Sequence, residues 1–311
     1  MKFKKYLWGI LYGFILTLFT VYVLLDTFVI TRVYTSVPSE ENSLSLSSRP
    51  DNTLLSPNSP DGTRMQSVEI TDTTYLDDDI SITITTYREK DTSIYVADVQ
   101  ISMSEYLKTA FAQGTYGKNV TEKTSEVAMS NHAILAINGD YYGVQENGYV
   151  LRNGVLYRSS ASGTKEDLVI YRDGSFSVIS EAEISAEQLL SDEAEQVLSF
   201  GPALIVDGII SVSRDEEVGR ARTSNPRTAI GIVGDLRYLF VVSDGRTDES
   251  EGLSLYELAE FMQSLGAETA YNLDGGGSST MYFNGHVINH PTTSGRSIRE
   301  RSVSDIVYIG Y

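Results

Sequence analysis

Alternating and clustered apolar residues divide the chain from residue 68 to its C-terminus into short strands and a few helices. β-branched residues cluster or alternate at residues 80–87 and 94–101, which is typical of strands. Hairpins are expected around Asn153-Gly154 and Asp173-Gly174, because both dipeptides favour tight turns. Helices are expected at residues 104–112, 121–130, 185–191 and 253–265. The pattern predicts an α+β fold, a mixed β-sheet domain with packed helices.

The N-terminus has a different pattern, a continuous apolar run. Residues 7–25 hold no charge over 19 positions, and they follow three lysines and precede Asp26. Such a run is long enough to cross a bilayer as one helix, with the lysines in the cytoplasm. A cleaved signal peptide is the alternative, but its apolar region is usually shorter and no Ala-x-Ala type of cleavage site follows. We expect a cytoplasmic N-terminus at residues 1–6 and a transmembrane signal anchor at residues 7–30.

Between this anchor and the globular part the composition changes. Residues 36–65 are rich in Ser, Pro, Asn and Asp and have only scattered Leu. Such a segment cannot bury enough apolar surface to offset the entropy of ordering the chain. The sequence therefore predicts a disordered linker at residues 31–66 and one extracytoplasmic domain at residues 67–311.

Composition narrows the classes of function. The chain has 311 residues, 41% of them hydrophobic, which is enough for a sizeable core. Its formal net charge is −18, from 24 basic and 42 acidic residues, and this argues against a nucleic-acid partner, because phosphate backbones bind basic surfaces. The sequence has no cysteine, so disulfides, a thiol nucleophile and a thiolate metal site are excluded.

The strongest candidate for chemistry lies within residues 271–283. An apolar segment ends at Asp274, and three glycines separate this carboxylate from Ser278. Glycines allow the backbone to approach a ligand closely or to adopt positive φ without a Cβ clash. A plain turn at the end of a strand is the alternative interpretation. We interpret this segment as the floor of an active site because similar polar motifs occur at other strand ends.

Three further motifs combine strand ends with polar groups. They are Asn138-Gly139-Asp140, Asn225-Pro226-Arg227-Thr228 and Asp244-Gly245-Arg246. Each has an ordinary alternative, since Asn-Gly is typical of hairpin turns and each arginine could pair with a neighbouring acid. The helix at residues 253–265 follows one apolar strand and precedes another, which favours parallel strands whose ends place Asp244 and Asp274 on the same side.

Several familiar kinds of site are disfavoured. Ser278 lacks the Gly-x-Ser-x-Gly turn of serine hydrolases, and its glycines are not followed by the Lys-Ser/Thr pair of a phosphate loop. A hard divalent cation held by Asp140, Asp244 or Asp274 stays open, because such ions take oxygen ligands, although no recognised loop spacing indicates one. His290, beside Pro291 after the central segment, is a weaker candidate for substrate contact.

Taken together and in this order, the four motifs resemble the phosphodiester glycosidase family. The resemblance covers roughly residues 68–311 and includes Ser199-Phe200-Gly201-Pro202 and Glu300-Arg301-Ser302-Val303. This family contains an animal enzyme that removes N-acetylglucosamine from a phosphodiester, and bacterial relatives labelled as exopolysaccharide-biosynthesis proteins. Together with the expected anchor, the resemblance implies a membrane-anchored hydrolase that cleaves a glycosyl phosphodiester in surface glycans. A non-catalytic glycan-binding or exopolysaccharide-assembly module is the alternative.

The chemistry of such a reaction suits these residues. Cleavage of a sugar C1–O–P linkage needs charge stabilisation on the phosphate and a carboxylate near the anomeric carbon. Arginine offers a planar fork of donors to phosphate oxygens, and an aspartate can act as base, nucleophile or electrostatic stabiliser. We therefore expect Asp274, Asp244 and Arg227 to be catalytic. The expected substrate-binding residues are Asn138, Gly139, Asp140, Arg246, Gly275, Gly276, Gly277, Ser278 and Arg301.

Overall fold

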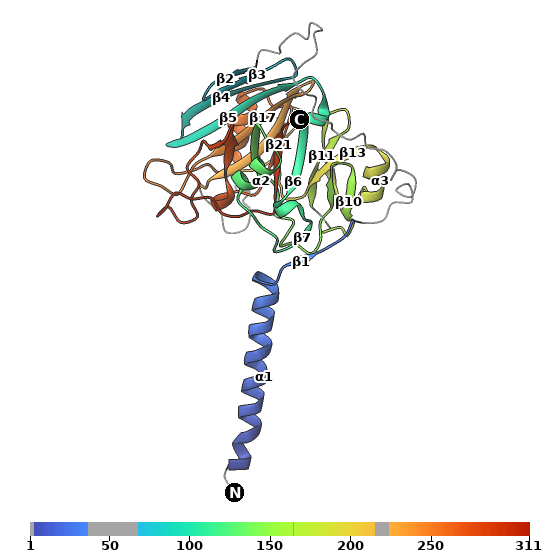
Figure 1. Cartoon of the computed structure of the whole chain (residues 1–311), viewed down its shortest axis with the longest axis vertical. Coiled ribbons are helices and arrows are strands. Elements are labelled where there is room, and N and C mark those ends of the chain that lie inside the picture. Colours follow the sequence, from blue (N-terminus) through green and yellow to red (C-terminus); the bar gives the residue numbers. More distant parts are fainter. Residues whose placement is uncertain (1–2, 37–67, 164, 215–223) are drawn as a thin grey trace, which may run out of the picture.

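The computed structural model describes residues 3–36, 68–163, 165–214 and 224–311, and its first element is a long apolar helix that projects from the domain (Figure 1). This helix, α1, spans Phe3–Phe28. Its segment Trp8–Phe28 is long and apolar enough to cross a membrane, and none of it is buried against the rest of the chain. The helix covers the apolar run from which the sequence predicted a signal anchor.

The chain contacts the domain directly after α1. Strand β1 (Arg32–Val33) pairs antiparallel with β7 (Gly117–Lys118). The amide of Tyr34 donates to the carbonyl of Tyr116 at 3.0 Å, so the contact extends one residue beyond the strand. Residues 32–34 therefore pack on the domain, although the sequence analysis assigned them to a linker. A two-residue strand leaves no periodic pattern to detect. Residues 37–66 of the predicted linker lie outside the described residues.

The largest sheet has nine strands in the order β15-β14-β18-β16-β17-β5-β4-β3-β2. These strands are β2 (Glu69–Ile70), β3 (Thr74–Leu76), β4 (Ile80–Glu89), β5 (Thr92–Ile101), β14 (Ala203–Val206), β15 (Ile209–Ile210), β16 (Arg227–Gly234), β17 (Arg237–Ser243) and β18 (Thr269–Asn272). Helix α4 (Leu255–Ser264) lies within the helix expected at residues 253–265, and its Leu258 and Met262 share a buried apolar cluster with Val241 of this sheet. Ser254 and Glu257 form a capping box that fixes the start of α4.

Two smaller sheets have five strands each. One has the order β20-β19-β8-β21-β6, with β6 (Leu107–Phe111), β8 (Leu135–Asn138), β19 (Met281–Phe283), β20 (His286–Val287) and β21 (Asp305–Ile309). The other has the order β10-β9-β13-β11-β12, with β9 (Val150–Arg152), β10 (Val155–Arg158), β11 (Glu166–Tyr171), β12 (Phe176–Ser180) and β13 (Ala194–Leu198). Helix α2 (Thr124–Ser130) packs on the first sheet and helix α3 (Ala186–Ser191) on the second. The hairpins β9–β10 and β11–β12 confirm the predictions at Asn153-Gly154 and Asp173-Gly174.

The predicted strand–helix–strand unit around α4 is present, with one difference. Strands β17 and β18 run in the same direction, but β16 lies between them and is antiparallel to both. Arg227 at the start of β16 is paired with Ser243 at the end of β17, and Ala229 is paired with Asn272 at the end of β18. Because of this register, Arg227, Asp244 and Asp274 lie at the same end of three neighbouring strands.

Two other expectations are wrong. Residues 104–112 do not form a helix: a short 3-10 turn at Ser104–Tyr106 leads into β6, which pairs with β21. Pairing with a distant strand has overridden the local helical tendency, as is common for short segments. The sheets are also not mixed, because neighbouring strands in the described ranges pair antiparallel throughout. The α+β class itself agrees with the structure.

Gly117 offers a test of the contact that follows α1. A Cβ atom at this position would lie 2.2 Å from the carbonyl oxygen of Arg32, so Gly117→Ala should displace β1. We expect the amides of Arg32 and Tyr34 to exchange with solvent roughly tenfold faster in this variant, because their backbone partners in and beside β7 are lost. Hydrogen exchange followed by mass spectrometry measures this, and the buried strand β8 serves as the internal control. Equal exchange at residues 32–34 in both proteins would show that the pairing does not hold this segment.

Candidate active site

Strand ends from two sheets meet around one buried amide, that of Asn138 at the end of β8. Its Oδ1 accepts hydrogen bonds from Thr228 Oγ1 at 2.9 Å and from the amide of Thr280 at 3.2 Å. Its Nδ2 donates to the carbonyl of Asp274 at 2.6 Å. The side chain is fully buried, so Asn138 joins the two sheets and fixes the main chain at Asp274.

Asp274 presents its carboxylate at this edge. Its Oδ2 accepts a hydrogen bond from Ser278 Oγ at 2.6 Å and lies 3.2 Å from Nη2 of Arg301. Arg301 also donates from Nε to Ser278 Oγ at 3.0 Å. Side-chain exposure is 13% for Asp274 and 42% for Arg301, so the carboxylate is mostly covered and the guanidinium is partly open to solvent. Burial raises the pKa of Asp274, and the positive charge of Arg301 opposes this rise.

The glycines after Asp274 let three other segments close on this turn. The amide of Gly276 donates to the carbonyl of Pro226 at 2.7 Å. Gly276 has φ +62°, and a Cβ there would lie 2.8 Å from Nη2 of Arg246. A Cβ at Gly277 would lie 2.4 Å from Oγ1 of Thr293. The predicted substrate-binding residues Gly275, Gly276, Gly277 and Ser278 therefore form one turn at the centre of the candidate site.

Arg246 stands against this turn. Its Nε and Nη2 donate to Asn225 Oδ1 at 3.2 and 3.0 Å, and its Nη1 donates to the carbonyl of Thr293 at 2.7 Å. Burial and the positive charge of Arg301 lower the pKa of Arg246. Within the described part of the chain no carboxylate pairs with Arg246, so the salt bridge considered as its alternative role is not seen there. Two guanidinium groups thus lie beside the glycine turn.

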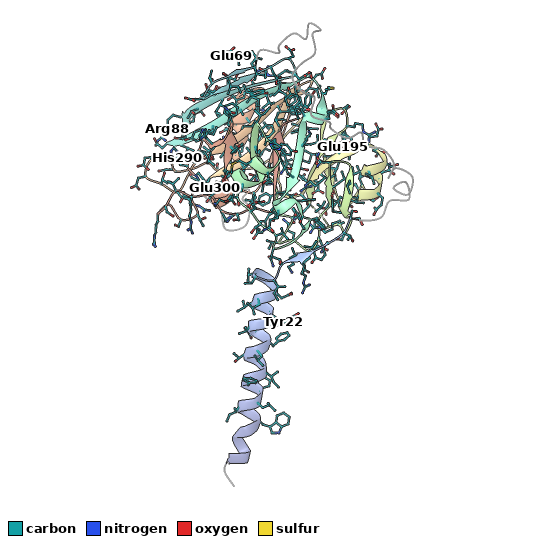
Figure 2. All side chains as sticks on the ribbon, in the orientation of Figure 1. Tyr22, Glu69, Arg88, Glu195, His290 and Glu300 are labelled. Carbon is teal, nitrogen blue, oxygen red and sulfur yellow. The ribbon has the colours of Figure 1, made fainter. Side chains whose placement is uncertain are left out.

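Asp244 holds an exposed histidine. Its Oδ1 accepts hydrogen bonds from the amide of His290 at 2.8 Å and from Asn289 Nδ2 at 3.1 Å. Its Oδ2 lies 3.1 Å from His290 Nδ1 and accepts from Tyr95 Oη at 3.2 Å. The carboxylate of Asp244 is 5% exposed and the imidazole of His290 is 65% exposed. In Figure 2, His290 lies on the same flank of the domain as Glu300, the neighbour of Arg301. Asp244 therefore orients an imidazole that is accessible to solvent.

Arg227 is buried rather than exposed at this edge. Its amide donates to Ser243 Oγ at 3.0 Å, and its Nε donates to the carbonyl of Leu253 at 2.8 Å. Only 3% of its surface is exposed. These contacts tie the start of β16 to the segments on either side of α4, and the catalytic role expected for Arg227 stays a prediction.

The remaining predicted residues, Gly139 and Asp140, stand behind Asp274. Nη2 of Arg152 donates to Asp140 Oδ2 at 2.9 Å and to Asp305 Oδ2 at 2.8 Å, in a buried ion triad. A Cβ at Gly139 would lie 2.4 Å from Oδ1 of Asp305, so only glycine fits there. Burial and the negative charge of Asp140 raise the pKa of Asp305 above its usual range. Direct substrate contact by Asn138, Gly139 and Asp140 stays a prediction, and their packing gives them positioning roles.

Sequence reasoning missed Arg152 and Asp305. Each is a charged residue at the end of an otherwise apolar strand, Arg152 at the end of β9 and Asp305 at the start of β21. A charge in such a position must be paired when it is buried. This rule could have indicated from the sequence that Arg152 and Asp305 are paired if they are buried, although it does not identify their partners.

The described residues contain no group of three or more His, Asp or Glu side chains placed to hold a metal ion. The divalent cation considered for Asp140, Asp244 and Asp274 stays an open question.

The chain was compared with known proteins. A family model described as phosphodiester glycosidase matches residues 131–310. N-acetylglucosamine-1-phosphodiester alpha-N-acetylglucosaminidase from Mus musculus is 30% identical over 175 residues, which are 51% of this chain and 33% of that protein. The SPbeta prophage-derived uncharacterized protein YomE from Bacillus subtilis is 30% identical over 203 residues, 63% of this chain and 31% of YomE. The chain thus spans about a third of the length of these relatives.

Solved structures share the fold. The catalytic domain of zebrafish N-acetylglucosamine-1-phosphodiester alpha-N-acetylglucosaminidase, described as auto-inhibited by its pro-peptide, superposes with a TM-score of 0.59 at 22% identity, over 75% of this chain and 83% of that one. A hypothetical protein from Synechocystis has a TM-score of 0.58 at 15% identity, over 75% of this chain and 62% of that one. At these low sequence identities, the similarity between this chain and the two solved structures concerns the fold alone.

A second group of buried acids extends behind the ion triad. The amide of Ser199 donates to Asp140 Oδ2 at 2.8 Å, and Ser199 Oγ donates to Glu181 Oε1 at 3.3 Å. Asp167 is fully buried beside Glu181. Burial, followed by the negative charge of Glu181, raises the pKa of Asp167 to about 9. In the folded protein this carboxyl is therefore protonated at neutral pH.

This raised pKa predicts a pH dependence of stability. An unfolded chain releases the Asp167 proton near the ordinary aspartate pKa, whereas the folded protein keeps it up to a pH of about 9. Unfolding therefore releases a proton across this interval, and the stability contributed by Asp167 falls as the pH rises. Asp167→Asn does not titrate, so its free energy of unfolding should fall less steeply from about pH 5 to about pH 8, by up to about 1.4 kcal/mol per pH unit.

Urea unfolding at several pH values measures this difference. Asp173→Asn is the matched control, because Asp173 lies in an exposed turn and hydrogen bonds from Ser175 lower its pKa. That variant should keep the slope of the wild type above about pH 5. Parallel curves for the wild type and Asp167→Asn would contradict a protonated Asp167 in the folded protein.

Proposed function

The chain belongs to the phosphodiester glycosidase family, and on this basis we propose that it hydrolyses the C1–O–P bond of a glycosyl phosphodiester. The observation that carries the proposal is the group formed by Asp274, Ser278 and Arg301, with Arg246 on the other side of the glycine turn. A carboxylate and two guanidinium groups at one edge match a substrate with an electrophilic sugar carbon and an anionic phosphate.

The reaction would use these groups as follows. Arg246 and Arg301 bind the phosphate oxygens, and the C1–O bond breaks with its electron pair on the leaving phosphate. Asp274 stabilises the positive charge that develops at C1. The oxygen of a water molecule then bonds to C1, and its proton passes to a base. A phosphate monoester is a good leaving group, so this scheme needs no strong general acid.

His290 is our candidate for the base. Its ring is exposed and Asp244 binds its Nδ1, which leaves Nε2 directed away from this carboxylate. Asp244, expected to be catalytic from the sequence, would then act by orienting the imidazole. Arg227 would act by holding β16 beside Asp274, through its contacts to Ser243 and Leu253.

We also propose that α1 anchors the chain in a membrane with the domain on the extracytoplasmic side. Support comes from the apolar helix Trp8–Phe28 and from the three lysines that precede it. The substrate would then be a phosphodiester-linked sugar of a surface glycan.

The first test replaces the proposed catalytic carboxylate. Asp274→Asn keeps the size of the side chain and an oxygen that accepts from Ser278, but it removes the charge. We expect the melting temperature to stay close to that of the wild type and kcat on a sugar-1-phosphodiester to fall by about two orders of magnitude or more. Asp207→Asn is the matched control, because Asp207-Gly208 is the same dipeptide in a hairpin turn elsewhere in the domain. It should keep full activity.

The pH profile adds a second measurement. Because burial raises the pKa of Asp274, the acid limb of kcat/KM should include an ionisation above the ordinary aspartate pKa, and Asp274→Asn should lack this ionisation but keep that of the proposed base. The substrate screen is run with and without a chelator to detect a metal requirement. Full activity of Asp274→Asn would exclude the catalytic role, and a wild type that binds the substrates without turnover would favour the non-catalytic alternative.

The second test concerns topology. Protease added to intact cells should remove the domain from residue 68 onward, because the lysine-rich end of α1 would stay in the cytoplasm. A cytoplasmic protein of the same cells serves as the control for integrity. A domain that is cleaved only after lysis would require the opposite orientation.

A further inference from the structure

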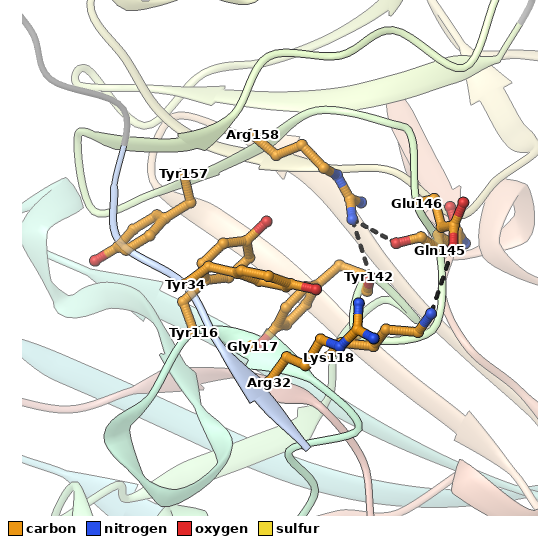
Figure 3. Close-up of a pocket in the computed structure, with 11 residues that line it drawn as sticks. Arg32, Tyr34, Tyr116, Gly117, Lys118, Tyr142, Gln145, Glu146, Tyr157 and Arg158 are labelled. Carbon is orange, nitrogen blue, oxygen red and sulfur yellow. Dashed lines mark hydrogen bonds and ion pairs between the residues drawn. The ribbon is translucent and has the colours of Figure 1, made fainter. Parts of the chain in front are cut away.

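A separate cavity of about 420 Å³, drawn in Figure 3, is lined by residues of β1 and β7, which lie at the end of the domain next to α1 (Figure 1). It is enclosed by β1, β7, β10 and the segment at residues 142–146. Tyrosine rings form one part of its wall: Tyr116 stacks on Tyr142 with ring centres 5.3 Å apart, and Tyr34 lies 5.8 Å from Tyr116. The cavity therefore combines aromatic surface with the segment that follows the apolar helix.

Three basic side chains surround this cavity in a chain whose net charge is −18. Figure 3 shows Arg158 on one side and Arg32 and Lys118 on the other. The acid in the lining is Glu146, whose side chain is 82% exposed and lies 3.4 Å from Lys118. Arg32 also pairs with Asp26 of α1. The local charge is thus positive, opposite to that of the whole chain.

Arg158 has a donor that its neighbours leave unused. Nε donates to the carbonyl of Gly148, and Nη1 donates to the carbonyls of Tyr142 and Gln145 at 3.2 and 2.6 Å. Nη2 is buried, and no described residue accepts a hydrogen bond from it. A buried charged donor is costly without an acceptor. A small movement of this side chain toward the cavity would give Nη2 an anionic oxygen as its acceptor.

The position of the cavity indicates the source of the anion. Arg32 pairs with Asp26 in the last turn of α1, so this side of the cavity lies beside the end of the helix. The polar headgroup region on each side of a bilayer is roughly 5–8 Å thick. Tyrosine, arginine and lysine are also typical of this interface.

From the charge, the unused donor and the nearness to α1, we propose that this cavity binds the phosphate-bearing headgroup of an anionic phospholipid. The proposal rests on the membrane anchoring proposed above and not on the hydrolase activity. The phosphate accepts hydrogen bonds from Arg158 and Lys118, and the tyrosine rings contact the apolar part of the headgroup. A bound lipid would connect β1 with β10 and so hold the domain against the bilayer.

The test uses the full chain in nanodiscs of phosphatidylcholine with increasing fractions of phosphatidylglycerol. We expect phosphatidylglycerol to raise the melting temperature and to slow amide exchange at residues 32–34, 116–118 and 142–146, because a ligand stabilises the state that binds it. Arg158→Gln and Lys118→Gln should weaken the apparent affinity for this lipid by about tenfold or more. Arg237→Gln is the control, an exposed arginine of β17 paired with Asp98, and should bind as the wild type does.

Arg158 also holds three carbonyls, so its variant can be unstable for that reason. Lys118→Gln leaves these three carbonyl contacts intact, so this variant tests the lipid site if Arg158→Gln is unstable. Equal stabilisation by pure phosphatidylcholine, or by free glycerol phosphate in place of lipid, would overturn a site for an anionic lipid. Unchanged affinity in Lys118→Gln would overturn it as well.

The same samples separate this proposal from the hydrolase. Turnover of a soluble glycosyl phosphodiester by Lys118→Gln should equal that of the wild type, because Lys118 lies outside the group around Asp274. An inactive wild type that still binds phosphatidylglycerol would overturn the proposed function and support the lipid site. A wild type that turns over the substrate but does not respond to phosphatidylglycerol would support the proposed function and overturn the lipid site.

Discussion

The interaction on which the candidate site depends is the buried ion triad of Asp140, Arg152 and Asp305. All three side chains are at most 2% exposed, and one guanidinium serves both carboxylates. Loss of the guanidinium would leave two acids buried together, and breaking a buried pair costs roughly 3–5 kcal/mol. That is a large part of the roughly 5–15 kcal/mol by which a domain is stable. The triad joins the end of β8 and the start of β21 to β9, and therefore joins two of the three larger sheets.

The position of Asp274 follows from these buried groups. The amide of Asp274 donates to the carbonyl of Gly139, the residue before Asp140, and its carbonyl accepts from Asn138. Arg301 lies four residues before Asp305 in the chain, and its guanidinium pairs with the carboxylate of Asp274. The main chain on one side of Asp274 and a cation on the other therefore fix the position of the candidate catalytic carboxylate. A reactive carboxylate needs such a rigid frame because small displacements weaken transition-state contacts.

The sequence predicts local structure well and long-range pairing poorly. Turn residues such as Asn153-Gly154 and the apolar face of α4 carry their own signals, and the strand–helix–strand pattern placed Asp244 and Asp274 at the same end of their strands. Nothing local indicates that β16 lies between β17 and β18, or that residues 107–111 pair with β21 as a strand. Whether a side chain is buried also depends on segments that are distant in the sequence. Asp140 and Arg227 look like site residues in the sequence, yet their surroundings come from other sheets and turns.

Electrostatics limit how an anionic substrate can reach this site. A chain with a net charge of −18 repels anions as a whole, but salt screens that repulsion beyond about 8 Å at physiological ionic strength. Inside that distance the guanidinium groups of Arg246 and Arg301 dominate, because both lie at the turn that carries Asp274. Under the proposed function, these local cations would give affinity for the anionic substrate without long-range attraction, and association from dilute solution would be slow. A domain held beside its substrate overcomes this difficulty, since tethering raises the effective concentration without any new contact. Membrane anchoring through α1, as proposed, would therefore compensate for the repulsion between an anionic substrate and the acidic chain.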